Sequence, residues 1–374
     1  MAAPARILTV NAGSSSLKLR LLGPGDELLL ARDLPAGESS RREGLAVLAG
    51  ECEFDAVGHR VVHGGPDHAG PARVDPALEH ELEALAELAP LHNPPALAAM
   101  RDLELLRPEV PTVACFDTAF HATIPAPAAT YAVPEEWRRR WPLRRFGFHG
   151  LSHAYASRRA AELLGRAPAE LRLVTAHLGA GASLAAVAGG RSLDTTMGFT
   201  PLEGLMMATR AGSVDPGLLL WVERHGGLEP EEVERALDRE SGLLALAGTA
   251  DMREVVAGAT AGEKRCQLAF DAYVHRLAAS IAAMAAALGG LDALVFTGGV
   301  GERSAPVRAA AAAATAFLGV RLDPELNAAP SGDTILSPTG AAAAVLRVEA
   351  REDLEIAGQV RGVLGGGTGR AGDG

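Results

Sequence analysis

Lysine is almost absent from this chain of 374 residues, which contains only Lys18 and Lys264. The 35 basic residues are therefore nearly all arginines, and 46 acidic residues bring the formal net charge to −11. Such an acidic balance argues against general binding of nucleic acid or of an anionic membrane surface. Any recognition of an anionic ligand must come from arginines, helix ends and backbone N–H groups in a local pocket.

Cysteine is scarce and long apolar segments are missing. Cys52, Cys115 and Cys266 form no CxxC pair, which favours free thiols in a reducing compartment. The opening MAAPARILTV contains no extended apolar stretch typical of a signal peptide. The longest apolar helical stretch, residues 277–288, is shorter than the roughly 20 residues that span a bilayer. We therefore expect a cytoplasmic protein with no membrane partner.

The chain length favours two domains over one ordinary core. Residues 6–23 and 171–190 both follow a pattern of strand, turn of small residues and strand. Residues 23–50 are expected to form a short connection with one helix, and residues 125–142 a proline-rich loop. A helix pair is expected over 76–106, broken at Pro94–Pro95. Strands and helices that alternate in two similar halves predict a duplicated α/β fold with a ligand in the cleft between the halves.

Two common phosphate-binding motifs are missing. No G-x-x-x-x-G-K-[ST] occurs, and GAGASL and GGVGERS lack the third glycine of G-x-G-x-x-G. Three segments remain in which a strand meets a turn of small residues: 11–16, 177–183 and 297–303. Small residues let backbone N–H groups approach an anion closely. One such turn is ordinarily only a hairpin turn, but three in a two-lobed chain favour a nucleotide site.

Six segments, in order, resemble the acetate kinase family: VNAGSSSLK, GHRVVHGG, FDTAFH, RFGFHGLSH, DTTMGFTPLEGLMMATR and VFTGGVGE. That family belongs to the superfamily of acetate and sugar kinases, Hsp70 and actin, with duplicated ribonuclease H-like domains. The resemblance implies an N-terminal domain of residues 1–118 plus 355–374 and a C-terminal nucleotide-binding domain of residues 119–354. It also implies an active site in the interdomain cleft and a homodimer.

The activity that the resemblance implies is reversible transfer of the γ-phosphoryl group of ATP to acetate, giving acetyl phosphate and ADP. Acetate is already ionised, so the difficulty is to bring two anions together and neutralise the phosphoryl group in transfer. Arginine suits this task because its planar fork binds carboxylate or phosphoryl oxygens through two parallel bonds. The resemblance assigns catalysis to Arg60, Asp117, His149 and Arg210. Asp117 would orient an arginine or hold a metal-bound water, and His149 would donate to the transferring group.

The resemblance also assigns residues that contact ligands. The acetate pocket would consist of Arg60, Val62, Leu91, Phe148 and Pro201. The ATP site would consist of Ser16, Lys18, His177, Gly179, Gly181, Asp251, Arg253, Gly299 and Gly301. Asn11 and Glu352 would bind Mg²⁺ or Mn²⁺, with Asp353 as the alternative one residue away, because these ions prefer hard oxygen ligands.

Several departures and alternatives remain open. Ala180 and Ala182 stand where the family usually has Asn and Ser, so we expect weaker nucleotide binding at this turn. A propionate kinase would need a pocket one methylene larger. One methylene changes the free energy that discriminates two substrates by only about 1–3 kcal/mol. A catalytically weakened regulator or chaperone-like ATPase is a further alternative. His149 and His153 have the spacing of a zinc-binding helix, but position 150 lacks the glutamate of H-E-x-x-H.

Overall fold

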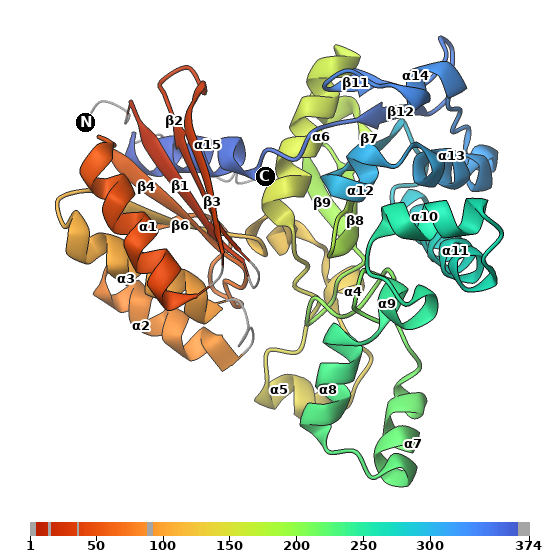
Figure 1. The fold of residues 1–374 in the computed structure, drawn as a ribbon, viewed down its shortest axis with the longest axis horizontal. Helices are drawn as coiled ribbons and strands as arrows, with labels where there is room; N and C mark the ends of the chain where they lie inside the picture. Colours follow the sequence, from red (N-terminus) through yellow and green to blue (C-terminus); the bar gives the residue numbers. More distant parts are fainter. Residues whose placement is uncertain (1–4, 14–15, 36, 88–92, 366–374) are drawn as a thin grey trace. The chain divides into compact units, whose positions relative to one another are not determined.

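The computed structural model describes residues 5–13, 16–35, 37–87 and 93–365, which divide into two compact units (Figure 1). Unit 1 contains the described parts of residues 1–122 and 351–374 together with residues 148–151. Unit 2 contains residues 123–147 and 152–350. Among the helices of the described residues, none combines the length and apolar character that crossing a membrane requires.

Each unit is built on a six-stranded sheet, and the two sheets have the same strand order. In unit 1 the order is β3 (Leu28–Pro35), β2 (Ser16–Leu22), β1 (Ile7–Ala12), β4 (Ala56–Val61), β6 (Thr112–Phe116) and β5 (Ala72–Arg73). In unit 2 it is β9 (Arg191–Thr195), β8 (Ala182–Ala188), β7 (Arg172–Leu178), β10 (Ala293–Thr297), β12 (Ala344–Arg347) and β11 (Thr334–Ile335). In both, an antiparallel three-stranded meander is followed by two parallel strands and a short antiparallel edge strand. The predicted duplication is confirmed.

The unit 1 sheet is covered by helices on both faces (Figure 1). Side chains alternate between the faces of a strand, so Leu8 and Val10 pack with helices α1 (Glu38–Glu51) and α3 (Asn93–Leu106). Ile7 and Cys115 pack instead with α15 (Glu352–Leu364). A Cβ on Gly58 of β4 would lie 2.4 Å from a methyl group of Ile356 on α15. Glycine at this position therefore lets α15 lie close to the sheet. Helix α2 (Pro76–Ala84) packs beside α3.

In unit 2 the 24-residue helix α11 (Lys264–Ala287) packs across β7, β8 and β9. Helix α6 (Gly150–Leu164) contacts the same sheet through His153, whose ring nitrogens lie 2.8 Å from Thr175 Oγ1 and Ser183 Oγ. The remaining helices are α4 (Ala126–Ala129), α5 (Glu135–Arg140), α7 (Pro216–Gly226), α8 (Pro230–Arg239), α9 (Gly242–Ala247), α10 (Met252–Thr260), α12 (Gly298–Arg303), α13 (Ala305–Ala314) and α14 (Pro324–Ala328).

Three local expectations are wrong, each for a physical reason. The segment 23–50 contains the edge strand β3 as well as α1, and no β3 residue is fully buried, so its alternation signal is weak. Pro94 and Pro95 lie in the first turn of α3 rather than between two helices, because a missing N–H costs nothing there. The proline-rich stretch 125–142 contains the short helices α4 and α5, each of which begins directly after a proline.

Candidate active site

Four of the predicted site residues converge at one edge of the unit 1 sheet. Asn11 lies near the end of β1, Arg60 lies on β4, and Asp117 directly follows β6. These three strands are parallel, so their carboxyl ends meet at one edge, where α/β sheets bind their ligands. The residues fall on the face that α15 covers, and Glu352 is the first residue of that helix.

The Arg60 guanidinium is the centre of this group. Its Nη2 donates to Asp117 Oδ2 at 2.5 Å, and its Nη1 donates to Asn11 Oδ1 at 3.0 Å. Its Nε lies 3.9 Å from Glu352 Oε2, which also accepts a 2.8 Å hydrogen bond from Asn11 Nδ2. Asp353 instead pairs with Arg351 at 2.9 Å. Of the two neighbouring acids, Glu352 is therefore the one in contact with the group.

Burial controls the charges in this group. It raises the pKa of the fully buried Asp117 carboxyl above its usual value, and Glu352 adds to the shift, while Arg60 opposes it. Burial by itself would lower the pKa of Arg60, but Asp117 and Glu352 reverse the effect and raise it. Among the described residues, the Asp117 and Glu352 side chains both lie beside the Arg60 guanidinium. Two acidic groups next to one arginine favour a bound divalent cation, which prefers oxygen ligands.

A strained turn brings His149 beside Asp117. Gly147 and His149 both have left-handed backbone angles, with φ of 76° and 57°. A Cβ on Gly150 would lie 2.0 Å from the Asp117 carbonyl oxygen, so only glycine fits there. The His149 N–H donates to the Asp117 carboxylate, and the Gly150 N–H donates to the Asp117 carbonyl at 3.0 Å. The turn therefore fixes the position of His149 relative to the acid.

The alternative of a zinc-binding helix is not supported by this geometry. His149 precedes α6 rather than lying on it. His149 and His153 therefore do not share a helical face. Within the described parts of the chain, no group of three or more His, Cys, Asp or Glu side chains is arranged to hold a metal ion.

The residues predicted to contact the acetate methyl group are mostly buried. Val62 and Phe148 are 5% and 1% exposed in unit 1. The Phe148 carbonyl accepts a 3.1 Å hydrogen bond from His121 Nε2, and its ring meets that of His63 edge-on at 5.5 Å. Pro201 is half-buried in unit 2. Leu91 lies outside the described residues.

Two residues that sequence reasoning missed hold the loop after β4. Asn93 accepts from the His63 N–H at 3.2 Å and donates to the His63 carbonyl at 3.0 Å. Thr118 Oγ1 accepts from the Gly64 N–H at 3.1 Å. Together they fix the chain directly after Val62. Neither has a local signature, because the contacts join residues 30 and 54 positions apart.

The two ATP-site residues predicted in unit 1 lie on β2. Lys18 pairs directly with Asn11 across the β1–β2 hairpin, so both side chains lie on one face of the sheet. Lys18 is exposed, and Ser16 is half-buried at the start of β2. The structure therefore places the Lys18 ammonium on the sheet face that carries Asn11 and Arg60, next to Asp33 on β3, whose pKa it helps to lower.

In unit 2, His177 lies near the end of β7. The turn that follows is closed by a 2.9 Å hydrogen bond from the Gly179 N–H to the Gly181 carbonyl.

Arg210 lies in a loop of unit 2, where its Nε donates to Asp238 Oδ1 on α8 at 2.9 Å. This contact fixes the Arg210 guanidinium against a helix of its own unit.

The other predicted ATP contacts fall in two further places of unit 2. Gly299 and Gly301 lie on α12, which begins directly after β10, and Gly299 is exposed. Asp251 caps the N-terminus of α10 and pairs at 2.5 Å with the exposed Arg253. The hydrogen bond from Arg253 lowers the pKa of Asp251.

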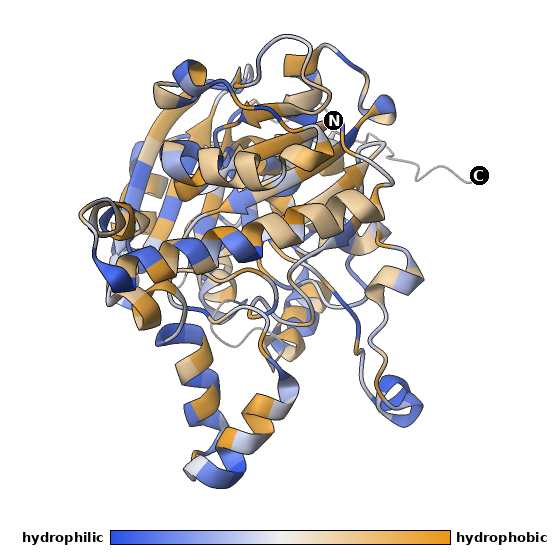
Figure 2. Cartoon of the chain, turned by 90° about the vertical axis from the view of Figure 1, so that its right-hand side faces the viewer, coloured by the Kyte–Doolittle hydropathy of each residue, from blue (hydrophilic) through white to orange (hydrophobic). Residues whose placement is uncertain are grey.

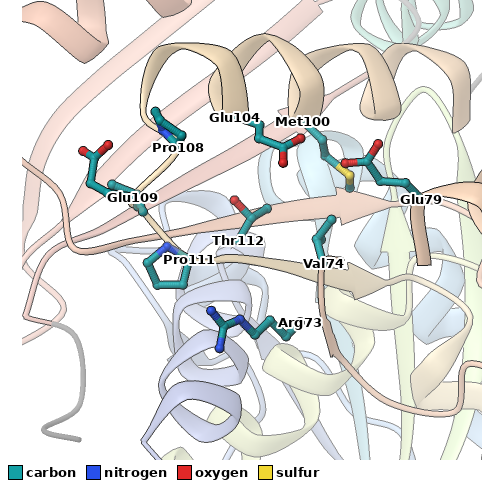
Figure 3. A pocket seen from close by; sticks show the side chains of 10 residues that line it. Arg73, Val74, Glu79, Met100, Glu104, Pro108, Glu109, Pro111 and Thr112 are labelled. Atoms are coloured by element: carbon teal, nitrogen blue, oxygen red, sulfur yellow. The ribbon is translucent and has the colours of Figure 1, made fainter. Parts of the chain in front are cut away.

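A separate pocket of about 130 Å³ lies in unit 1, and none of the residues that line it is a predicted site residue (Figure 3). It is lined by Arg73, Val74, Glu79, Met100, Glu104, Pro108, Glu109, Val110, Pro111 and Thr112. Its three carboxylates outnumber its one guanidinium. This balance of charge disfavours the binding of phosphate groups in the pocket.

Comparison with known proteins identifies the family of the chain. Residues 43–358 match the Acetokinase family. An acetate kinase from Synechococcus sp. (strain JA-2-3B'a(2-13)) is 46% identical, over 96% of this chain and 99% of its own. The chain belongs to the acetokinase family. The acetate kinase of Gloeobacter violaceus is 50% identical over 83% of this chain and 77% of its own.

Solved structures place the chain among acetokinases by fold as well. The acetate kinase of Porphyromonas gingivalis superposes with a TM-score of 0.89 at 34% identity, over 96% of this chain and all of that one. A propionate kinase from Francisella tularensis gives the same TM-score, identity and coverage. Members with different named substrates therefore share this fold equally well.

Proposed function

We propose that this acetokinase catalyses reversible transfer of the γ-phosphoryl group of ATP to acetate, giving acetyl phosphate and ADP by direct in-line displacement. The observation that carries the proposal is the Arg60 group at the carboxyl ends of three parallel strands. An arginine that already pairs with carboxylates suits a reaction whose acceptor is a carboxylate. The similar proteins named acetate kinases, at 42–50% identity, support the same activity.

In this proposal the chain orients two anions and neutralises their charge. Arg60 and Arg210 bind oxygens of the acetate and of the transferring group through their planar forks. Asp117 orients Arg60, and His149 donates a hydrogen bond to the phosphoryl group. Val62, Leu91, Phe148 and Pro201 remain the residues proposed to contact the methyl group of acetate. No general base is required, because acetate is already a nucleophile.

A divalent cation fits the donor set of unit 1. Glu352 and Asn11 offer the hard oxygen ligands that Mg²⁺ and Mn²⁺ prefer, and one or two protein oxygens suffice when water completes the shell. The two acidic side chains beside Arg60 favour the ion. A bound Mg²⁺ would supply neutralisation of phosphate charge. Glu352 and Asn11 would hold it, while Asn11 also fixes Arg60 Nη1.

The proposed nucleotide contacts come from both units: Ser16, Lys18, His177, Gly179, Gly181, Asp251, Arg253, Gly299 and Gly301. Backbone N–H groups of the glycine turns would approach the phosphates. We retain the expected division into domains of residues 1–118 plus 355–374 and 119–354. We also propose a cytoplasmic location, since the three cysteines are free thiols.

The decisive experiment measures acyl phosphate trapped as hydroxamate, with acetate, propionate or butyrate and with or without Mg²⁺ and ATP. We expect product that depends on the nucleotide and the metal, with acetate preferred. Absence of product with every acid would overturn the kinase proposal. Equal kcat/KM for propionate would favour the second candidate, propionate kinase, which the equally similar Francisella tularensis structure motivates.

We further propose a homodimer that uses helix α7. Leu218, Leu220 and Trp221 on this helix are 50%, 50% and 59% exposed, and no α7 residue is buried. Figure 2 shows hydrophobic residues on the α7–α8 hairpin at the bottom of the view. A helix with an unburied apolar face needs a partner surface. Light scattering after gel filtration should give twice the chain mass, and Leu220→Asp with Trp221→Asp should give monomers.

A further inference from the structure

The His177 ring lies between a serine and the glycine turn of unit 2. Its Nδ1 is 2.7 Å from Ser152 Oγ on α6. A Cβ built on Gly179 would lie 3.5 Å from His177 Nε2. One nitrogen of the ring therefore contacts the serine, and the other lies beside the turn that is proposed to bind phosphate.

The surroundings of Ser152 decide which atom donates. Ser152 is 1% exposed, and His177 Nδ1 is the one acceptor that its hydroxyl meets within the described part of the chain. If Nδ1 carried the proton, the buried serine hydrogen would have no acceptor, which costs stability. Ser152 therefore donates to Nδ1. The neutral ring then carries its proton on Nε2, beside the turn.

The composition of the turn makes this proton important. Gly179, Ala180, Gly181 and Ala182 have no polar side-chain atoms. Ser183, the next polar residue, lies 2.8 Å from His153 Nε2 in the buried sheet face. His177 is consequently the polar side chain positioned to donate at this turn. Its Nε2 must be protonated to bind an anion, because an unprotonated nitrogen would repel phosphate oxygens.

We propose that Ser152 is a positioning residue that holds His177 in the Nε2–H tautomer, so that His177 donates a hydrogen bond to a nucleotide phosphate. The proposal rests on the proposed kinase function for the identity of the ligand. The tautomer itself depends only on contacts within unit 2. Histidine ligands in other sites are oriented by the same kind of second hydrogen bond.

The first test reads the tautomer without reference to activity. Long-range proton–nitrogen spectra of protein labelled with ¹⁵N-histidine report which ring nitrogen of each of the 11 histidines carries hydrogen. A His177→Gln variant assigns the signal. We expect protonated Nε2 in the wild-type protein and a mixture of tautomers in Ser152→Ala. Protonated Nδ1 in the wild-type protein would overturn the proposal, whether or not the chain proves to be a kinase.

The second test uses nucleotide binding and kinetics. Ser152→Ala should raise the Kd and KM for ATP about tenfold, the effect of weakening one hydrogen bond to a charged group. The KM for acetate should stay within about twofold of the wild-type value, since the acetate contacts do not depend on this bond. Ser152→Thr, which keeps the hydroxyl, should recover most of the affinity and replaces the alanine variant if that fails to fold.

The matched control is Ser157→Ala. Ser157 is another buried serine of α6, and its hydroxyl donates to the Ala154 carbonyl at 3.0 Å rather than to an imidazole. We expect it to leave the KM for ATP unchanged. An equal rise of this KM in both variants, or no rise in Ser152→Ala, would show that Ser152 acts only in folding and would overturn the proposal.

Discussion

Two arginines of this chain, Arg60 and Arg308, are held by their surroundings in opposite ways. Arg60 in unit 1 meets two carboxylates and an amide, from Asp117, Glu352 and Asn11. Arg308 on α13 of unit 2 is 1% exposed and donates to four oxygens, which belong to the carbonyls of Gly301, Glu302 and Asn327 and to the Asn327 side chain. No carboxylate of the described residues forms a salt bridge with it.

The chemical type of the hydrogen-bond partners distinguishes the role of Arg308 from that of Arg60. Burial, with Arg347 nearby, lowers the pKa of Arg308 to about 10, so it remains protonated at neutral pH. Its partners are two backbone carbonyls at the end of α12 and the carbonyl and side-chain amide of Asn327 on α14, all of them uncharged groups of unit 2, and the helix end favours a cation. Arg60 instead pairs with the carboxylates of Asp117 and Glu352, and the proposed substrate acetate is also a carboxylate. We infer that Arg308 stabilises unit 2, whereas Arg60 can exchange a carboxylate partner for the substrate.

The largest expected effect is on catalysis at Arg60. Arg60→Lys keeps the charge beside Asp117 but loses the planar fork. We expect kcat/KM for acetate to fall about 10²–10³-fold, comparable to loss of one transition-state hydrogen bond, with little change in melting temperature. Steady-state kinetics and calorimetry measure the two effects. Arg73→Lys, at an exposed position of the same unit, is the control. Near-normal kcat/KM would remove Arg60 from the site.

Arg308 should show the reverse profile. Arg308→Met removes the donor from four oxygens, three of them in buried hydrogen bonds, so we expect the free energy of unfolding to fall by about 3 kcal/mol. The KM for acetate should remain close to the wild-type value. Urea unfolding followed by circular dichroism measures the loss, and the exposed Arg321→Met serves as control. Unchanged stability with lost activity would contradict the distinction between the arginines.

The sequence was sufficient to predict one of these arginines and not the other. Arg60 stands within GHRVVHGG, a motif that resembles a known family, and strand alternation explains why Asn11 and Arg60 share a face. Arg308 stands in the alanine-rich run APVRAAAAAA without any motif. Its partners include Asn327, 19 positions away, and a single side chain that reaches the backbone of another segment has no periodic signature.

The fold, like the two arginines, was predictable only where a local sequence pattern determines the structure. The duplicated sheets were predictable because both hairpins join two strands through a turn of small residues, and residues 16–21 alternate leucine with polar residues. Edge strand β3 was not, since it has no fully buried position. The contact of Ser152 with His177 joins residues 25 positions apart. Long-range polar contacts are consequences of packing, so they become visible only when the strands and helices are in place.

A smaller effect, on the dependence of activity on Mg²⁺, is expected from substitution of Glu352 beside Arg60. Glu352→Gln keeps the hydrogen-bonding shape near Asn11 but removes one negative charge. We expect the Mg²⁺ concentration for half-maximal activity to rise about tenfold, in the range seen when groups that support a metal are removed. Asp353→Asn, whose carboxylate pairs with Arg351, should leave this concentration unchanged. A larger effect at Asp353 would show that the neighbouring acid binds the metal.

The smallest effect concerns His59, which adjoins Arg60 but faces away from it. Both of its ring nitrogens are buried without a hydrogen-bond partner in the described structure, and burial lowers its pKa to about 3. The native state therefore favours the neutral ring. Its contribution to stability is complete above the unfolded pKa of about 6.5 and is lost as pH falls from there towards 3.

His59→Leu removes this titration and should make the free energy of unfolding less dependent on pH. Between pH 6 and 4 the slope should fall by about 1 kcal/mol per pH unit, close to the value for one proton. Urea unfolding at several pH values measures it, with the exposed His80→Leu as control. An unchanged slope would mean that His59 is solvated or paired in solution. A reduced slope with normal kcat would show that adjacent residues of β4, on opposite sheet faces, serve stability and catalysis separately.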